Sequence, residues 1–426
     1  MSGFHYRLRA PGEPLTVADW RRRARRRLPR MVWAYVEHGA DGERTLRENE
    51  SAFAGRRLNQ RVLTRTSAVD LGVTVAGTPL ALPILLAPTG LAGAVHWHGD
   101  LGAAQAAEEA GTRLVLSSAS AYSIEEMALS TRADHFFQLY PWRDRALTAS
   151  LISRARDCGY RALVVTVDVP VYGNRLRERR TGMTLPPTLT PLRVLDAARH
   201  PRWCYGYFRH RRTTLRNLVP DGRSIPAADS VHIQSSNLTA NMGWADLEWI
   251  RTRWHGPLYV KGILHPDDAE RAVETGADGV IVSNHGGRQL DAVPASIHAL
   301  PAVAERVGDR CEVLVDGGIR TGTDIAVALA LGARACLIGR PLLYGLAAAG
   351  SHGVAAVLRI LREELTRTLT LMGLPDVGDL DRSCLAEPEQ TAASGLPRRP
   401  GQEGKAHRPT YTPADVTVWK PPPPSK

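Results

Sequence analysis

The segment SNHGGRQLD, residues 283–291, combines a base with an anion-binding group. His285 is followed by two glycines and then by Arg288. A guanidinium can bind a carboxylate through two parallel hydrogen bonds. An imidazole beside that carboxylate could take a proton from the hydroxyl group or the α-carbon of a small acid. A single histidine is more often structural than catalytic, but this pairing favours His285 as a catalytic base.

Two further segments, DGGIRTGTD (316–324) and LIGRP (337–341), are typical of a phosphate site. Each places glycines ahead of an expected helix, where free amide N–H groups and the helix dipole favour an anion. Lys261 ends an apolar run that should be buried, and a buried lysine requires a negative partner. Two interpretations of Lys261 remain open: a salt bridge to Asp or Glu, or stabilisation of an anion on a cofactor.

Eight short apolar runs alternate with stretches of helical pattern. The runs cover residues 82–88, 113–118, 135–140, 162–168, 258–263, 279–284, 311–318 and 335–340, and helix-like stretches such as 101–111, 144–159, 266–276 and 323–332 lie between them. Apolar runs bounded by helices predict buried parallel strands. Eight of them in one series favour a closed (β/α)8 TIM barrel over the alternative, an open doubly wound sheet. Nearly every run ends in polar or glycine residues, and in a barrel these ends converge on one face, where active sites lie.

The chain is expected to have three parts. Residues 1–80 form an N-terminal helical extension, with helices over about 16–28 and 30–52, and residues 81–385 form the barrel. After the fourth run, residues 169–257 form an insertion far longer than a normal βα connection, and we expect it to be a mobile functional segment. Residues 386–426 are rich in proline, glycine and charge, and we expect a disordered tail.

The composition is ordinary for a soluble globular protein, with 43% hydrophobic and 23% charged residues. The five cysteines are scattered, which predicts neither a disulfide framework nor a metal site. There is no uninterrupted run of 18 apolar residues and the N-terminus is polar and basic, so we expect a cytoplasmic protein. The net charge of +11 concentrates in residues 21–30 and 199–216. We interpret both as solvated faces, with a peripheral membrane contact through 199–216 as the alternative and no nucleic-acid partner.

Several motifs, in this order along the chain, resemble the family of FMN-dependent 2-hydroxy acid oxidases and dehydrogenases, which includes glycolate oxidase, L-lactate dehydrogenase and mandelate dehydrogenase. The motifs are LPRMVWAYVEHGADGERTL, FFQLY, TVDVP, VKGI, SNHGGRQLD, DGGIR and IGRP, and the likeness covers about residues 16–385. The resemblance implies an FMN enzyme that oxidises a 2-hydroxy acid to the 2-oxo acid. It also implies a homotetramer, with oxygen or a quinone or other carrier as electron acceptor.

The resemblance further implies roles for individual residues. His285 would be the base, Asp168 would orient it and stabilise its imidazolium, and Tyr140 would hydrogen-bond the substrate. The substrate carboxylate would lie between Arg288 and Tyr35, with help from Arg175. The implied flavin contacts are Pro88, Thr89, Gly90, Ser117, Gln138, Thr166, Lys261, Ser283, Asp316, Gly317, Gly318, Arg320, Gly339 and Arg340.

Two positions depart from the glycolate oxidase pattern and match the mandelate dehydrogenase branch. Ala119 follows LSS where glycolate oxidase has tryptophan, and Gly90 follows APT where alanine is usual. The segments PTGLAGAVHWHGD and HPRWCYGYFRH also resemble that branch. The space freed by both changes could bury a phenyl ring. We therefore expect an aromatic or bulky L-2-hydroxy acid, such as mandelate or 4-hydroxymandelate, with L-lactate as the alternative.

Two other classes of protein could share some of these features. Another phosphate-binding flavin barrel, such as a type 2 isopentenyl diphosphate isomerase or a glutamate synthase domain, could share a DGGIR-like turn. A non-catalytic basic adaptor could use the two arginine-rich regions. Neither class explains the presence of His285 and Arg288 together with Tyr35, Tyr140 and Asp168.

Overall fold

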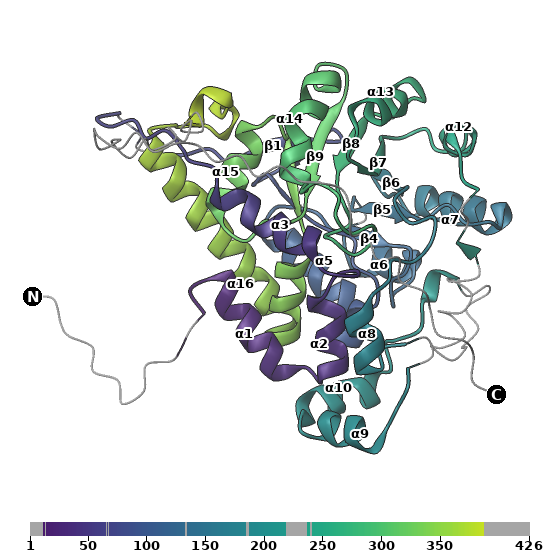
Figure 1. Ribbon diagram of the computed structural model, residues 1–426. Coiled ribbons are helices and arrows are strands. Elements are labelled where there is room, and N and C mark those ends of the chain that lie inside the picture. Colours follow the sequence, from purple (N-terminus) through teal and green to yellow (C-terminus); the bar gives the residue numbers. More distant parts are fainter. Residues whose placement is uncertain are drawn as a thin grey trace, which may run out of the picture. The chain divides into compact units, whose positions relative to one another are not determined.

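The computed structural model describes residue 12 and residues 14–386, apart from 65, 67, 133, 185–186, 219–236 and 239–240. Eight parallel strands form one sheet in the order β3-β10-β9-β8-β7-β6-β5-β4. A parallel bridge between Leu86 and Leu114 joins the two ends of this order, so the sheet closes into a barrel (Figure 1). The strands are β3 (Ile84–Leu86), β4 (Val115–Ser117), β5 (Phe136–Leu139), β6 (Ala162–Thr166), β7 (Leu258–Ile263), β8 (Gly279–Val282), β9 (Glu312–Asp316) and β10 (Ala335–Ile338).

Every barrel strand lies within one of the eight predicted runs, so the prediction of a (β/α)8 barrel is confirmed. The strands are buried almost throughout because helices cover the outside and side chains fill the inside. The helices that follow strands along the chain are α4 (Ala92–Val95), α5 (Gly99–Glu109), α6 (Ile124–Ser130), α7 (Arg145–Asp157), α13 (Pro266–Glu274), α14 (Ser296–Val307), α15 (Gly322–Ala330) and α16 (Arg340–Met372).

The N-terminal extension differs from the prediction in one respect. Helix α1 (Val17–Arg27) is capped by Thr16 and matches the helix predicted over about 16–28, but the single helix predicted over 30–52 is two helices, α2 (Arg30–Glu37) and α3 (Arg44–Ala54). The break occurs at HGADGE, where Asp41 and Glu43 adopt positive φ angles. A Cβ on Gly39 would lie 2.5 Å from the carbonyl oxygen of Gly287. The break therefore lets the chain pack against the segment that carries His285. A short hairpin, β1 (Val73–Val75) and β2 (Thr78–Leu80), follows.

The predicted insertion, residues 169–257, contains several helices. In the described part of this segment they are α8 (Leu176–Thr181), α9 (Pro191–Ala198), α10 (Pro201–His210), the 3-10 turn Arg216–Leu218 and α12 (Trp244–Arg251). Its mobility stays a prediction. The predicted disordered tail lies outside the described residues, except for Ala386.

Helix α16 is the one described helix that is long and apolar enough to cross a membrane. Two thirds of its most apolar window is buried inside the protein, as in the core helix of a soluble domain. The helix is kinked at Ala349 and Gly350, whose backbone angles are not helical. Two 3-10 turns, Val377–Asp379 and Arg382–Cys384, end the described chain.

Candidate active site

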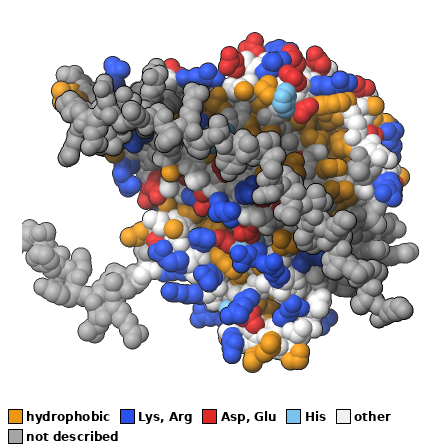
Figure 2. All heavy atoms as spheres, in the orientation of Figure 1, with side chains coloured by type: hydrophobic (Ala, Val, Ile, Leu, Met, Phe, Trp, Pro, Cys, Tyr) orange, Lys and Arg blue, Asp and Glu red, His pale blue; other side chains and the backbone are white. Residues whose placement is uncertain are grey.

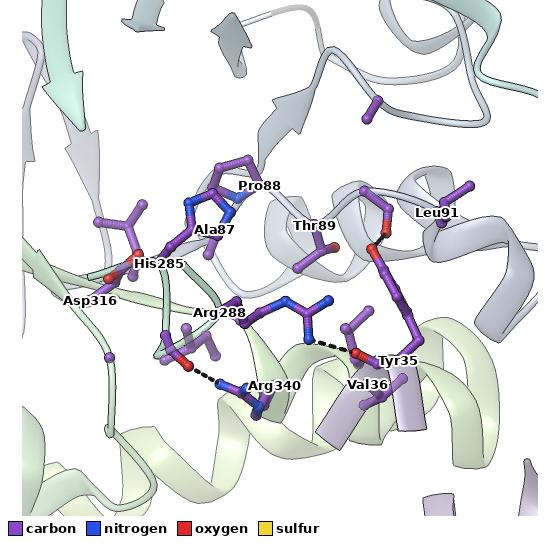
Figure 3. A pocket seen from close by; sticks show the side chains of 18 of the residues that line it. Tyr35, Val36, Ala87, Pro88, Thr89, Leu91, His285, Arg288, Asp316 and Arg340 are labelled. Carbon is purple, nitrogen blue, oxygen red and sulfur yellow. Dashed lines mark hydrogen bonds between the residues drawn. The ribbon is translucent and has the colours of Figure 1, made fainter. Parts of the chain in front are cut away.

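A pocket opens at the carboxyl ends of the barrel strands (Figure 3). The atom-free space within it, including the part that is open to solvent at its mouth, is about 1360 Å3. Predicted site residues from segments far apart in the chain line it: Tyr35, Pro88, Thr89, Gly90, Gln138, Tyr140, Thr166, Arg175, Lys261, His285, Arg288, Asp316, Gly317, Gly318, Arg320, Gly339 and Arg340. The other three, Ser117, Asp168 and Ser283, lie directly behind this lining, where they hydrogen-bond Gln138, His285 and Lys261.

His285 and Asp168 form a hydrogen-bonded pair. Nδ1 of His285 lies 3.0 Å from Oδ1 of Asp168, which follows strand β6. Burial alone would raise the pKa of the Asp168 carboxyl, but the charge and hydrogen bond of His285, with help from Lys261, hold that pKa below its usual value. In the form of the ring that can act as a base, Nδ1–H donates a hydrogen bond to the ionised Asp168 and Nε2 is the basic nitrogen. This is the arrangement that a general base requires.

The segment after β8 holds His285 in a backbone conformation that is unusual for any residue other than glycine. His285 has a φ of 58°, and Gly286 and Gly287 also have positive φ. Asn284 braces this turn: its buried side chain pairs with Asn49 of α3 at 2.8 Å and accepts the Gly287 N–H at 3.1 Å. Two buried amides in this pairing fix the loop, since each satisfies the polar groups of the other.

Arg288 is held by the N-terminal extension. Its Nη1 donates to the carbonyl oxygens of Tyr35 at 2.8 Å and His38 at 2.7 Å, and its guanidinium lies over the Tyr35 ring at 5.0 Å. Its Nη2 donates to Glu178 of α8 at 2.9 Å. Tyr35 donates its own hydroxyl to the Gly90 carbonyl at 2.6 Å (Figure 3). Burial lowers the pKa of Arg175, and the nearby positive charge of Arg288 lowers it further.

Tyr140 is the third predicted catalytic residue. Burial raises the pKa of its hydroxyl well above the usual value, and the charge of Asp168 adds to the effect. The hydroxyl is therefore protonated near neutral pH and can donate a hydrogen bond. Its ring packs edge-on against Trp142 with centroids 5.6 Å apart, which fixes its direction.

One wall of the pocket carries alternating donors and acceptors. Ser117 donates to Gln138 Oε1 at 3.1 Å, and Gln138 Nε2 donates to Thr166 at 3.0 Å. Lys261, which is 4% exposed, pairs with Asp316 at 2.8 Å and donates to Ser283 at 2.7 Å. The salt bridge considered for Lys261 is therefore present, and Lys261 also lines the pocket. In the described chain the buried Oδ1 of Asp316 has no hydrogen-bond partner, so it is free to accept from a bound group.

The opposite end of the pocket has the features of a phosphate site. Gly317 and Gly318 adopt positive φ after β9, and Gly339 precedes the first turn of α16. Arg340 donates to the carbonyl oxygens of Gly286, Glu37 and His38 at 2.9–3.2 Å but pairs with no carboxylate among the described residues. Burial lowers its pKa to about 10. A cation of this kind, beside a helix N-terminus, fits an anionic ligand. Arg320 forms a salt bridge with Glu50, with Nη2 lying 2.7 Å from Oε1.

Several residues that line the pocket were not predicted from the sequence, among them Tyr172, Glu178, Met183 and Leu343; Ala119 was predicted as a wall residue. The position of Glu178 could have been predicted from the sequence, because Glu178 lies three residues after Arg175, the N-cap of the short helix α8. Tyr172 and Met183 belong to the insertion, and no spacing rule predicts which of its residues reach the barrel.

Comparison with known proteins identifies the family. The sequence model of one protein family, the FMN-dependent dehydrogenases, matches residues 24–387. The chain belongs to this family. It is 42% identical to an L-lactate dehydrogenase of Caulobacter sp. (strain K31), over 88% of this chain and 99% of the relative. A solved monotopic membrane protein, (S)-mandelate dehydrogenase, superposes with a TM-score of 0.85 and 40% identity, covering 88% of this chain and 99% of the other. A soluble mutant of the membrane-associated (S)-mandelate dehydrogenase from Pseudomonas putida has a TM-score of 0.76 and 38% identity, covering 87% and 99%.

Membership of this family makes the protein an FMN-dependent 2-hydroxy acid dehydrogenase or oxidase. The pocket fits FMN on two observations made above: the unpartnered oxygen of Asp316 and the cationic, glycine-lined end at Gly339 and Arg340. The family assignment also decides against the diphosphate isomerase and the non-catalytic adaptor as alternatives.

Proposed function

We propose that this enzyme oxidises an L-2-hydroxy acid with an aromatic or bulky side chain, such as mandelate or 4-hydroxymandelate. The observation that supports this choice is the contact between Gly90 and Ala119. Both line the pocket, and a Cβ on Gly90 would lie 3.3 Å from the Cβ of Ala119. A large side chain at position 119 would fill the space beside Gly90. Two small residues there leave room for a phenyl ring, whose burial contributes about 1.5–3 kcal/mol.

The proposed mechanism assigns each step to a residue of the chain. Arg288 binds the substrate carboxylate, with Arg175 and Tyr35 beside it, and Tyr140 donates a hydrogen bond to the substrate oxygen. Nε2 of His285 takes the proton that leaves the substrate's hydroxyl or α-carbon, and Asp168 stabilises the imidazolium that results. FMN supplies the two-electron acceptor. The 2-oxo acid is the product.

Anaerobic mixing of the purified enzyme with a panel of 2-hydroxy acids tests the proposal, because a substrate bleaches the flavin absorption. We expect kcat/KM for mandelate to exceed that for glycolate by about 10–100-fold, since each 1.4 kcal/mol corresponds to a factor of ten. Ala119→Trp should depress the use of mandelate far more than the use of L-lactate. If the parent enzyme prefers glycolate or L-lactate outright, the aromatic assignment is wrong and the L-lactate alternative takes its place.

We also propose that α9 and α10 contact a membrane surface. For residues 199–216 a membrane contact was the alternative to a solvated face, and we extend the proposed surface to α9. Six large apolar side chains on or just before these helices are at least half exposed: Leu189, Leu192, Val194, Leu195, Tyr205 and Phe208. Arginines flank them, and Figure 2 shows orange and blue side chains together at the lower end of the molecule, where Figure 1 places α9 and α10. An apolar face edged by cations is suited to anionic lipid. The membrane origin of the mandelate dehydrogenase relatives supports the proposal.

Co-flotation with vesicles tests the membrane contact. The enzyme should float with vesicles containing phosphatidylglycerol at low ionic strength, and high salt should weaken the binding. The double variant Leu192→Glu, Phe208→Glu should stay in solution. Leu129→Glu is the matched control, because Leu129 is 88% exposed but lies on α6, outside this surface. No binding of the parent at low salt would refute the contact.

A membrane contact favours a quinone over oxygen as the electron acceptor. We expect a soluble quinone analogue to reoxidise the reduced enzyme faster than dissolved oxygen does, and the opposite order would identify an oxidase. The homotetramer also stays a prediction, which light scattering in solution tests.

A further inference from the structure

Glu178 places a carboxylate inside a pocket that otherwise attracts carboxylates. It lies on α8 (Leu176–Thr181), lines the pocket and is 7% exposed. A buried glutamate beside an anion-binding site opposes the binding of an anion unless its charge is offset. Its presence at this wall therefore requires an explanation.

The contacts of Glu178 show what offsets its charge. Oε1 of Glu178 accepts from Nη2 of Arg288 at 2.9 Å, and both side chains are largely buried. Among the described residues, the hydrogen bonds of the second cation of this wall, Arg175, go to neutral acceptors: the Arg288 carbonyl at 3.4 Å and the Gln289 side-chain oxygen at 3.5 Å. The wall thus carries two positive charges and one negative charge.

The other charged groups of the pocket supply no further cation to this wall. Lys261 pairs with Asp316 at 2.8 Å, and Arg320 pairs with Glu50 at 2.7 Å. Asp168, 3.0 Å from His285, adds a negative charge at the base. Arg340 stands at the glycine-lined phosphate end, where FMN accounts for it. The wall of Arg175, Arg288 and Glu178 therefore offers the substrate at most one net positive charge, which the carboxylate of a 2-hydroxy acid neutralises.

We propose that Glu178 makes the enzyme selective for substrates with a single carboxylate. Arg288, the partner of Glu178, lies over the Tyr35 ring, and the Tyr35 hydroxyl donates to the carbonyl of Gly90, beside which the substrate's side chain is proposed to lie. A second carboxylate on that side chain would therefore face the charge of Glu178 after the first carboxylate has neutralised the free cation of this wall. The inference rests on the proposed oxidation of 2-hydroxy acids and narrows the substrate class to monocarboxylates with an uncharged side chain.

A different role for Glu178 predicts a different result. If Glu178 only holds the Arg288 guanidinium in place, its removal should weaken all 2-hydroxy acids alike, whatever charge their side chains carry. Selectivity for charge, and not activity itself, is therefore the quantity that separates the two roles.

The test compares substrate pairs that differ in charge and little in size. L-2-Hydroxyglutarate and L-malate are each paired with the ω-amide, in which the distal carboxylate is replaced by a carboxamide. The measured quantity is the ratio of flavin reduction efficiencies, kcat/KM, of the amide to the acid in the holoenzyme. For the parent we expect a ratio of about 10–100, the effect of one like-charge contact in a partly desolvated site.

Glu178→Gln keeps the shape and removes the charge, so the ratio should fall to near one. Glu178→Asp keeps the charge and should retain most of the preference for the amide. Glu125→Gln is the matched control: Glu125 pairs with Arg154 at 2.6 Å but lies outside the pocket, and its removal should leave the ratio unchanged.

Two outcomes would overturn the proposal. One is a parent that reduces its flavin equally well with acid and amide, a result that needs no variant to fold. The other is a Glu178→Gln enzyme that loses activity toward both while the ratio stays at the parent's value. If 2-hydroxy monocarboxylates bleach the flavin of the parent enzyme normally in either case, the proposed 2-hydroxy acid oxidation stands and only the proposed role of Glu178 is wrong. If no 2-hydroxy acid bleaches the flavin of the parent enzyme, both the proposed function and the proposed role of Glu178 are wrong.

Discussion

At the scale of single residues, the cations of the pocket are distinguished by their partners. Arg288 pairs with Glu178, Lys261 with Asp316 and Arg320 with Glu50, whereas Arg340 contacts only backbone carbonyls among the described residues. Sequence analysis selected all four from motifs. It could not assign their partners, because each pair joins segments that are far apart in the chain.

Replacing Arg288 by lysine tests whether the fork of the guanidinium matters beyond its charge. Arg288 uses one nitrogen for the Tyr35 and His38 carbonyls and another for Glu178. A lysine cannot bridge these groups and also bind a carboxylate through two parallel bonds. We expect kcat/KM to fall by about 10–100-fold, since a charged hydrogen bond contributes about 1.5–3 kcal/mol. Parental kinetics for Arg288→Lys would move carboxylate recognition to Arg175.

At the scale of elements, the sequence predicted best those strands whose pattern of apolar residues follows directly from their burial. All eight barrel strands fall inside apolar runs, because a buried parallel strand needs apolar side chains on both faces. The break between α2 and α3 was missed because residues 30–52 keep a helical pattern across it. The break depends on a tertiary contact, the approach of Gly39 to Gly287, which no local pattern encodes.

Asp100 connects helix α5 to the loop that carries Ala119. Ser120 donates to Oδ2 of Asp100 at 2.7 Å, and burial raises the pKa of this carboxyl to about 6. Because the folded pKa lies above the unfolded value of 3.8, folding favours the protonated acid, and the penalty for burying the ionised form develops between about pH 4 and pH 6. Above pH 6 this penalty is complete, at about 3 kcal/mol.

Asp100→Asn removes the ionisation and keeps an acceptor for Ser120. A small part of the penalty is already present at pH 4, so the difference in free energy of unfolding between variant and parent should shift in favour of the variant by about 2.5 kcal/mol from pH 4 to pH 7.5. Chemical denaturation at both pH values measures it. Hydrogen bonds lost by the substitution affect both pH values equally, so a difference that does not change with pH would contradict the assigned pKa.

At the scale of the whole molecule, the site is assembled from segments that span most of the described chain. Tyr35 comes from α2 and Arg340 from the start of α16, and both reach the His285 segment at the carboxyl ends of the strands. Strand-end polarity predicted this convergence for the barrel residues. The role of Tyr35 came only from the family resemblance, because an extension before the first strand has no position fixed by barrel geometry.

FMN should stabilise the whole fold, because its site exists only in the folded state. Removal of FMN should lower the Tm, and FMN at 100–1,000 times its Kd should restore about 3–4 kcal/mol. Arg340→Leu should lose most of this response, since Arg340 has no carboxylate partner in the described chain. Thermal unfolding of parent and variant, with and without FMN, measures the effect. An equal FMN response in both proteins would place the phosphate elsewhere.

The central claim is that His285, oriented by Asp168, is the base in the oxidation of a 2-hydroxy acid. Anaerobic stopped-flow reduction of FMN in the parent and in His285→Gln tests it most directly. Glutamine keeps a polar side chain of similar reach but cannot accept the proton, so the variant should bind FMN and lose the rate of bleaching by about 10²–10⁴-fold. Bleaching at the parental rate in His285→Gln, with FMN bound, would contradict the account.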